Sequence, residues 1–342
     1  MRSGNSLFCG VMLLSFATLL AGCAAPKITM CKLIPGTVSE AARMKKIAVL
    51  PFDGSYGPEF AAELESSLAN IRVKDSLFYD VVSRTALDKV MSEQNLSHSG
   101  LVDTRSAVRV GKMVGAQGLY VGQVTTAMYH DTPYKEARTE CIERNKKGKC
   151  LSYRNYDVNC LKRTAELTVV PKLVDVETGQ ICYSETFKRT EESKGCSDTS
   201  APKNGEQMLT ALRGSIIQTL GRQVAPHSEN VDVKLLADSD DISSDAAKEK
   251  LKQGMAFAEN NRMARACEIW EEGRSLAPSS ISYLHNLAVC AEADGNLEKA
   301  QAMLREADKK LLKPNDIISA SMARVEADLA SKKKLQEQLG RK

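Results

Sequence analysis

The sequence predicts an α/β domain followed by an all-α domain of helical repeats. Two observations lead to this fold class. Between residues 45 and 226, short apolar runs rich in β-branched residues alternate with segments whose apolar residues recur at helical spacing. From residue 245 to 338 only the helical spacing persists, and it repeats with a period of 34 residues. The chain has 342 residues, enough for two such domains.

The chain begins with a predicted leader over residues 1–22. Residues 7–20 are almost wholly apolar; this run is short for a transmembrane helix but fits the core of a signal peptide. The stretch LAGC that ends at Cys23 resembles the lipobox of bacterial lipoproteins, in which the cysteine is acylated and becomes the first residue. A plain signal peptide followed by a chance cysteine is the alternative.

The lipobox resemblance also implies where in the cell the protein is located. Residue 24 is Ala rather than Asp, which by the sorting rule of lipoproteins favours the outer membrane. We therefore expect a lipid anchor at Cys23, a tether over residues 23–44 and a chain that faces the periplasm. Several acyl chains on one residue give stable anchoring.

The α/β domain is expected to use strands and helices in alternation. The expected strands are 46–52, 78–83, 119–125, 165–176 and 180–188, with the last two joined by a hairpin connection at 177–179. The expected helices lie around residues 60–71, 86–96, 104–114 and 208–220. Residues 191–204 are polar and are predicted to be a loop, and residues 227–244, rich in Asp and Ser, a linker.

Cysteines are numerous for an exported chain. Eight remain after Cys9 leaves with the leader and Cys23 takes lipid, and an even number suggests disulfides. The rival interpretation is metal binding, but no C-x-x-C pair occurs and the four histidines are scattered. We therefore predict no metal site. Cys141 and Cys150 flank a polar turn inside a highly charged segment, residues 129–163, and are the first expected disulfide.

Residues 44–226 resemble the curli production assembly/transport (CsgG-like) lipoprotein family. The matching pieces are KIAVLPFD at 46–53, the strand–helix unit at 78–94, the glycine-rich turn at 111–124 and the hairpin VDVETGQ at 174–180. The resemblance implies a mixed sheet flanked by helices. It also implies a role in the cell envelope, often as a ring-shaped homo-oligomer.

Members of that family differ in role, and the alternatives stay open here. Some are secretion channels whose inserted hairpins cross the outer membrane, and related lipoproteins activate peptidoglycan synthases or assist surface-structure assembly. A transmembrane strand needs about 9–11 residues that keep charge away from lipid. The segment 136–149 carries too many charged residues to form such a strand. Residues 129–163 are therefore expected to form a periplasmic insertion, closed by a disulfide, that contacts a partner.

Residues 245–338 resemble tetratricopeptide repeats. Small and aromatic residues stand at the offsets of that repeat, and a second copy starts 34 residues later; these residues are Gly254, Phe257, Ala266, Trp270, Gly273 and Pro278, then Leu287, Ala288, Ala300, Leu304 and Ala307. A generic helical hairpin is the alternative. The resemblance implies binding of a protein partner, with Phe257, Trp270, Tyr283 and Leu287 as candidate contact residues. Cys267 and Cys290 fall on neighbouring antiparallel helices and could form a disulfide.

Catalytic patterns are absent from the sequence. The glycine-rich run at 111–118 lacks the Gly-Lys-Ser/Thr of a phosphate loop, and neither G-x-S-x-G nor H-E-x-x-H occurs. The net charge is +4 and falls to +3 without Arg2, and so small a charge does not indicate nucleic-acid binding. We therefore predict a non-enzymatic lipoprotein without a cofactor, which serves as an assembly or scaffold factor in the envelope.

Overall fold

The computed structural model describes residues 26–73, 75–93 and 104–340, which form two compact units. The α/β unit consists of Cys31–Asn230 together with the end of the chain from Ala327. The helical unit consists of Val231–Glu326 together with residues 26–30. The predicted fold class, a mixed α/β domain followed by a helical region, is confirmed.

The α/β unit is built on a six-stranded mixed sheet with the order β5–β2–β6–β7–β8, and β9 also pairs with β7. The central strand β2 (Lys46–Val49) is parallel to β5 (Asp80–Val81) and to the start of β6 (Gly118–Arg144). The remaining strands are antiparallel to their neighbours: β7 (Cys150–Asp175), β8 (Ile181–Ser184) and β9 (Phe187–Cys196).

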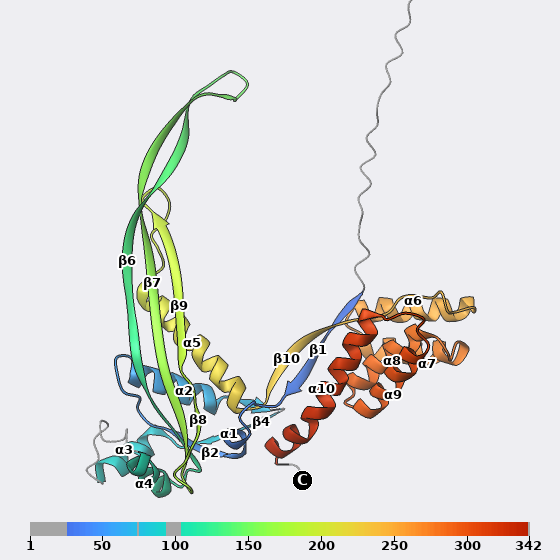
Figure 1. Cartoon of the computed structure of the whole chain (residues 1–342), viewed down its shortest axis with the longest axis horizontal. Coiled ribbons are helices and arrows are strands. Elements are labelled where there is room, and N and C mark those ends of the chain that lie inside the picture. Colours follow the sequence, from blue (N-terminus) through green and yellow to red (C-terminus); the bar gives the residue numbers. More distant parts are fainter. Residues whose placement is uncertain (1–25, 74, 94–103, 341–342) are drawn as a thin grey trace, which may run out of the picture. The chain divides into compact units, whose positions relative to one another are not determined.

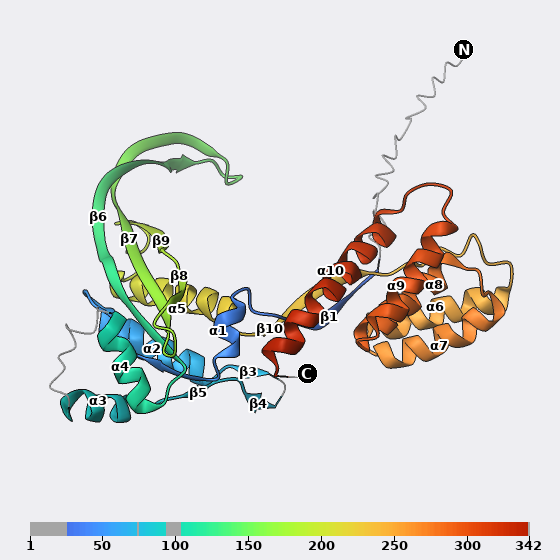
Figure 2. The same cartoon turned by 60° about the horizontal axis from the view of Figure 1, so that its bottom comes forward.

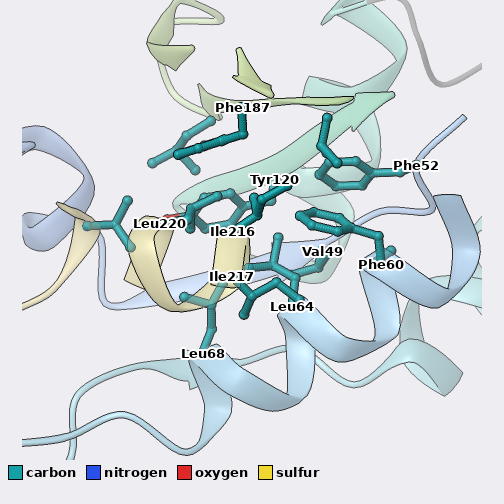
Figure 3. Close-up of a cluster of buried hydrophobic side chains, with 14 of the residues drawn as sticks. Val49, Phe52, Phe60, Leu64, Leu68, Tyr120, Phe187, Ile216, Ile217 and Leu220 are labelled. Atoms are coloured by element: carbon teal, nitrogen blue, oxygen red, sulfur yellow. The ribbon is translucent and has the colours of Figure 1, made fainter. Parts of the chain in front are cut away.

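Helices cover both faces of this sheet because the side chains of β2 alternate between two cores. Ile47 and Val49 belong to a cluster with α2 (Gly57–Ala69) and α5 (Gly205–Val224), part of which Figure 3 shows around Tyr120 and Phe60. Ala48 belongs to a second cluster with α3 (Arg84–Glu93) and α4 (Thr104–Val114). The central strand is therefore buried on both sides, which explains its continuous apolar sequence.

Strands β6 and β7 form a hairpin that continues far beyond the helices (Figure 1). Their ladder runs from Gly118 opposite Asp175 to Arg144 opposite Cys150. The predicted insertion at 129–163 is therefore not a separate element but the outer part of these two strands. The predicted loop at 191–204 is also wrong in its first part, because β9 reaches Cys196 and pairs with β7 along its whole length.

The last turns of α10 (Asp316–Gln338) dock onto the beginning of the α/β unit. The fully buried side chain of Gln338 accepts a hydrogen bond from the N–H of Gly36 and donates one to its carbonyl, at 2.9 and 2.8 Å. Lys45 Nζ donates to the Gln338 carbonyl at 2.7 Å and lies 3.5 Å from the ring centre of Phe78. Burial lowers the pKa of Lys45 to about 8. The last turns of α10 thus belong to the α/β unit.

The helical unit contains consecutive antiparallel helices, as Figure 2 shows for α6 to α9. Their bounds are α6 Asp245–Glu259, α7 Met263–Leu276, α8 Ile281–Ala293 and α9 Leu297–Lys309. Two glycines allow close approach. A Cβ on Gly254 would lie 2.1 Å from Trp270 Nε1, and a Cβ on Gly273 would lie 2.0 Å from the Tyr283 hydroxyl. These two sites explain why the repeat pattern has glycine there.

The predicted tether and linker both contain regular structure. Within 23–44 lie β1 (Lys27–Ile34) and the short helix α1 (Ser39–Arg43), whose Ala41 and Ala42 are fully buried. Within 227–244 lies β10 (His227–Lys234), which pairs with β1 in a two-stranded sheet. Pairing between strands about 200 residues apart, rather than local composition, decides the structure of these segments.

Candidate partner-binding sites

The proposed lipid-attachment residue, Cys23, lies outside the residues that the structure describes. The described part of the chain contains no helix with the length and apolar character needed to cross a membrane. Lipid attachment therefore remains a prediction of the sequence.

The end of the β6–β7 hairpin is held by a disulfide between Cys141 and Cys150, whose Cα atoms are 5.8 Å apart. Inside this bridge the side chain of Asn145 accepts hydrogen bonds from the N–H groups of Lys147 and Lys149, at 2.9 and 3.0 Å. Gly148 takes a positive φ of 79° that favours glycine. The polar turn is therefore a fixed structure.

A second disulfide, between Cys160 and Cys196, joins β7 to the last residue of β9. The even number of cysteines is the only sign of this pair in the sequence, and the pair was not predicted. The connection that follows β9 is fixed to the hairpin by Asp198, which accepts a hydrogen bond from Arg138 Nε at 2.9 Å. A neighbouring cavity of about 710 Å³ lies between the hairpin and this connection.

One group of potential metal ligands occurs among the described residues, namely Glu136 with Cys160 and Cys196. Both sulfur atoms belong to the disulfide, so neither is available as a thiolate ligand in this state. The two cysteines without a disulfide among the described residues are Cys31, which is exposed, and Cys182, whose pKa is raised by burial.

Three of the four candidate partner-contact residues are buried in the helical unit. Trp270 and Tyr283 are fully buried; Trp270 Nε1 donates to the carbonyl of Leu251 and the Tyr283 hydroxyl to that of Ala247. Leu287 is only 3% exposed. Trp270 and Tyr283 thus pack the core of the repeats, whereas Leu287 also lines the groove described next, and a role of these residues in partner binding stays a prediction. Phe257 is partly exposed and lies under the guanidinium of Arg262.

An open groove of about 600 Å³ lies between α7, α8 and the start of α9. The disulfide Cys267–Cys290 lies in it, and its Cα atoms are 6.0 Å apart. Acidic side chains predominate among the charged residues that line the groove: Glu268, Glu271 and Asp294, with Lys299 as the one cation. Lys299 Nζ is 3.6 Å from Glu271 and Arg265 Nη1 is 2.6 Å from Glu268, so Asp294 is the acid of this lining that forms no ion pair with another described residue.

A buried polar network connects α8 with α10. His285 is fully buried, with Nε2 3.0 Å from the Ser321 hydroxyl and Nδ1 3.1 Å from the Asn286 side-chain oxygen. Burial lowers the pKa of His285 to about 4. Arg324 donates two hydrogen bonds to the carboxylate of Glu292, at 2.7 and 2.8 Å. These groups satisfy one another and serve packing rather than ligand binding.

Comparisons with known proteins give one family match. Residues 39–203 match the family model described as curli production assembly/transport component CsgG. No curated protein matches the sequence significantly.

Several solved structures show remote similarity. The LpoB C-terminal domain from Salmonella enterica is 17% identical, with coverage of 45% of this chain and 92% of that chain and a TM-score of 0.26. Lipoprotein GNA1162 from Neisseria meningitidis is 12% identical, with coverages of 52% and 97% and a TM-score of 0.29. The PelC dodecamer from Paraburkholderia phytofirmans is 16% identical, with coverages of 58% and 99% and a TM-score of 0.25. From the family match, residues 39–203 carry a domain similar to the curli production assembly/transport component CsgG.

Proposed function

We propose that this protein is a non-enzymatic lipoprotein, anchored in the outer membrane through Cys23 and exposed to the periplasm. It acts there as an assembly or scaffold factor for a machine of the cell envelope, and its helical repeats bind a protein partner. The observation that carries the proposal is the match of residues 39–203 to the CsgG family model, in a chain whose start resembles a lipoprotein leader.

The distribution of perturbed ionisable groups supports a scaffold rather than an enzyme. Among the described residues, burial shifts the pKa strongly for Tyr120 and His285, which are fully buried in separate cores. Burial also shifts the pKa of Lys45 and Tyr79, which line one cavity, but both bond to backbone carbonyls there: Lys45 to those of Ala42 and Gln338, and Tyr79 to that of Val224. A catalytic site would be expected to gather such groups in one accessible cavity. The three disulfides fit an oxidising compartment such as the periplasm.

The groove between α7, α8 and α9 is the partner site that we propose for the repeats. Its acidic side chains favour a segment that carries Lys or Arg, because opposite charges at an interface guide encounter and register. Of the four contact residues expected from the sequence, Leu287 lines this groove. Glu268 and Asp294 are the residues to alter first, since neither belongs to the core.

Two experiments test the proposal. Cys23→Ser should move the protein from the membrane fraction to the periplasmic fraction; if the variant stays with the membrane, the anchor is refuted. In-cell crosslinking from a photoreactive residue at position 264, which also lines the groove, should capture a partner, and Glu268→Lys with Asp294→Lys should abolish the capture. A crosslinked product that is unchanged in this double variant would show that the groove is not the site.

A second candidate function is a component of an oligomeric secretion channel, favoured by the 27-residue and 26-residue strands of the hairpin. Against it, charge occurs on both faces of the ribbon. Lys135 and Asp157 lie on one face, and Glu136, Arg138 and Arg154 on the other, according to strand alternation and register. Ion conductance of the purified protein in planar bilayers would select the channel over the scaffold.

A further inference from the structure

The turn at the end of the β6–β7 hairpin concentrates positive charge. Between Glu143 and Lys149 there are four basic residues and a single acid, which leaves a net charge of +3 on a chain whose total is +4. The basic residues are Arg144, Lys146, Lys147 and Lys149, and all are exposed. None of them forms an ion pair with another described residue, whereas Arg138 and Arg154 further along the ribbon do.

The backbone of this turn is held in place although its charges have no acidic partner. The Cys141–Cys150 disulfide closes it, Asn145 binds two of its N–H groups, and Arg144 donates to the Gly148 carbonyl at 3.1 Å. Fixing like charges beside one another is unfavourable for the isolated chain. A fixed cationic turn is therefore suited to binding a ligand with closely spaced negative charges, because little ordering remains to be done on binding.

Large apolar side chains surround the cationic turn and are open to solvent. Ile142, Leu151 and Tyr153 are 60%, 57% and 66% exposed. Ile142 occupies a register shift between Cys141 and Glu143, so it has no direct partner across the ladder. Leu151 and Tyr153 are two residues apart on β7 and share a face. An isolated ribbon has no core in which these groups could be buried.

We propose that this tip, residues 142–153, docks on an anionic lipid surface. Lysines near such a surface are attracted by its headgroups, each strengthening binding by about fivefold at low salt. Ile142, Leu151 and Tyr153 then enter the boundary between headgroups and acyl chains, where apolar and aromatic side chains are stable. The contact is additional to any anchor at Cys23 and does not depend on the proposed function.

Lipid is favoured over a hydrophilic anionic polymer because of the apolar residues. A phosphorylated or acidic polysaccharide would account for the lysines but would leave Ile142 and Leu151 in water. A membrane interface accommodates both kinds of side chain in one binding event. The two ligands therefore differ in their response to removal of the apolar groups.

The test uses the chain from residue 24 onward, which contains every described residue, and vesicles of phosphatidylcholine with or without phosphatidylglycerol. We expect sedimentation with the anionic vesicles alone, weakening steeply as salt is raised. The variant K146Q/K147Q/K149Q should bind about a hundredfold more weakly, from about fivefold per lysine. The matched control K89Q/K112Q/K252Q removes the same charge from three exposed lysines on other elements and should bind like the parent chain.

The apolar part is tested separately. I142S/L151S should weaken vesicle binding about tenfold, in line with the transfer of two partly exposed aliphatic side chains. Tyr153→Trp should show a blue shift in fluorescence with anionic vesicles, over the constant emission of the buried Trp270. The proposal is overturned if anionic vesicles do not bind, or if K146Q/K147Q/K149Q binds like its control. It is also overturned if I142S/L151S binds unchanged, the result expected for a purely electrostatic contact such as that with an anionic polymer.

Discussion

Removal of the Cys267–Cys290 disulfide should destabilise the helical unit by a predictable amount. The bridge joins α7 to α8 across a sequence separation of 23 residues. Closing a loop of that length in the unfolded chain corresponds to about 3 kcal/mol of conformational entropy at 25 °C. In C267A/C290A the free energy of unfolding of the helical unit should therefore fall by about 3 kcal/mol, while the α/β unit keeps its stability.

The chain contains its own probe for this measurement. Its single tryptophan, Trp270, is fully buried in the helical unit, so the change in tryptophan fluorescence during urea unfolding reports on that unit alone. With a dependence of about 1.5 kcal/mol per molar urea, a loss of about 3 kcal/mol lowers the midpoint by about 2 M.

The control is C141A/C150A, which removes a disulfide from the hairpin of the α/β unit. Its tryptophan midpoint should equal that of the parent protein. If C267A/C290A shows an unchanged midpoint, or if both variants shift it equally, the assignment of the bridge as a stabilising link between α7 and α8 is refuted.

Three further predictions concern the same unit and use the same titration. Gly254→Val places a Cβ 2.1 Å from Trp270 Nε1, and overpacking of this kind should cost about 1–3 kcal/mol. Arg324→Ala removes the guanidinium that pairs with the buried carboxylate of Glu292 and should cost about 3 kcal/mol; no change would mean that water replaces it. Burial lowers the pKa of His285 to about 4, so the unfolded chain, with a histidine pKa near 6.5, takes up the proton first. Stability is therefore complete above pH 6.5 and should fall by about 3 kcal/mol towards pH 4, and His285→Gln should remove most of this pH dependence.

Elements that pack against a core were predictable from the sequence, because burial leaves a continuous or periodic pattern of apolar residues. The strand at Lys46–Val49 and the helices of the repeats have apolar residues at the spacing that their packing requires. The outer half of the hairpin has no such pattern. Its residues from Glu136 to Arg144 are exposed or half-exposed, so polar side chains occupy both faces and the ladder with β7 alone makes them strands.

The candidate sites were less predictable for the same reason. Trp270 and Tyr283 stand out in a repeat pattern because they build its core, so the pattern identifies packing rather than contact residues. The groove between α7, α8 and α9 depends on side chains that the helix period leaves undetermined, such as Glu268 and Asp294. The pairing of Cys160 with Cys196 required the register of β9 on β7, which no local signal provides.

The hydrogen bonds between Gln338 and Gly36 have a consequence for biosynthesis. These residues are 302 positions apart, so during synthesis the backbone groups of Gly36 are made long before the Gln338 side chain that binds them. A nascent or truncated chain that stops near residue 226 would leave both groups without this partner, and Lys45 would lose one of its two carbonyl acceptors. Loss of α10 through a premature stop codon would therefore weaken the α/β unit as well as the helical unit.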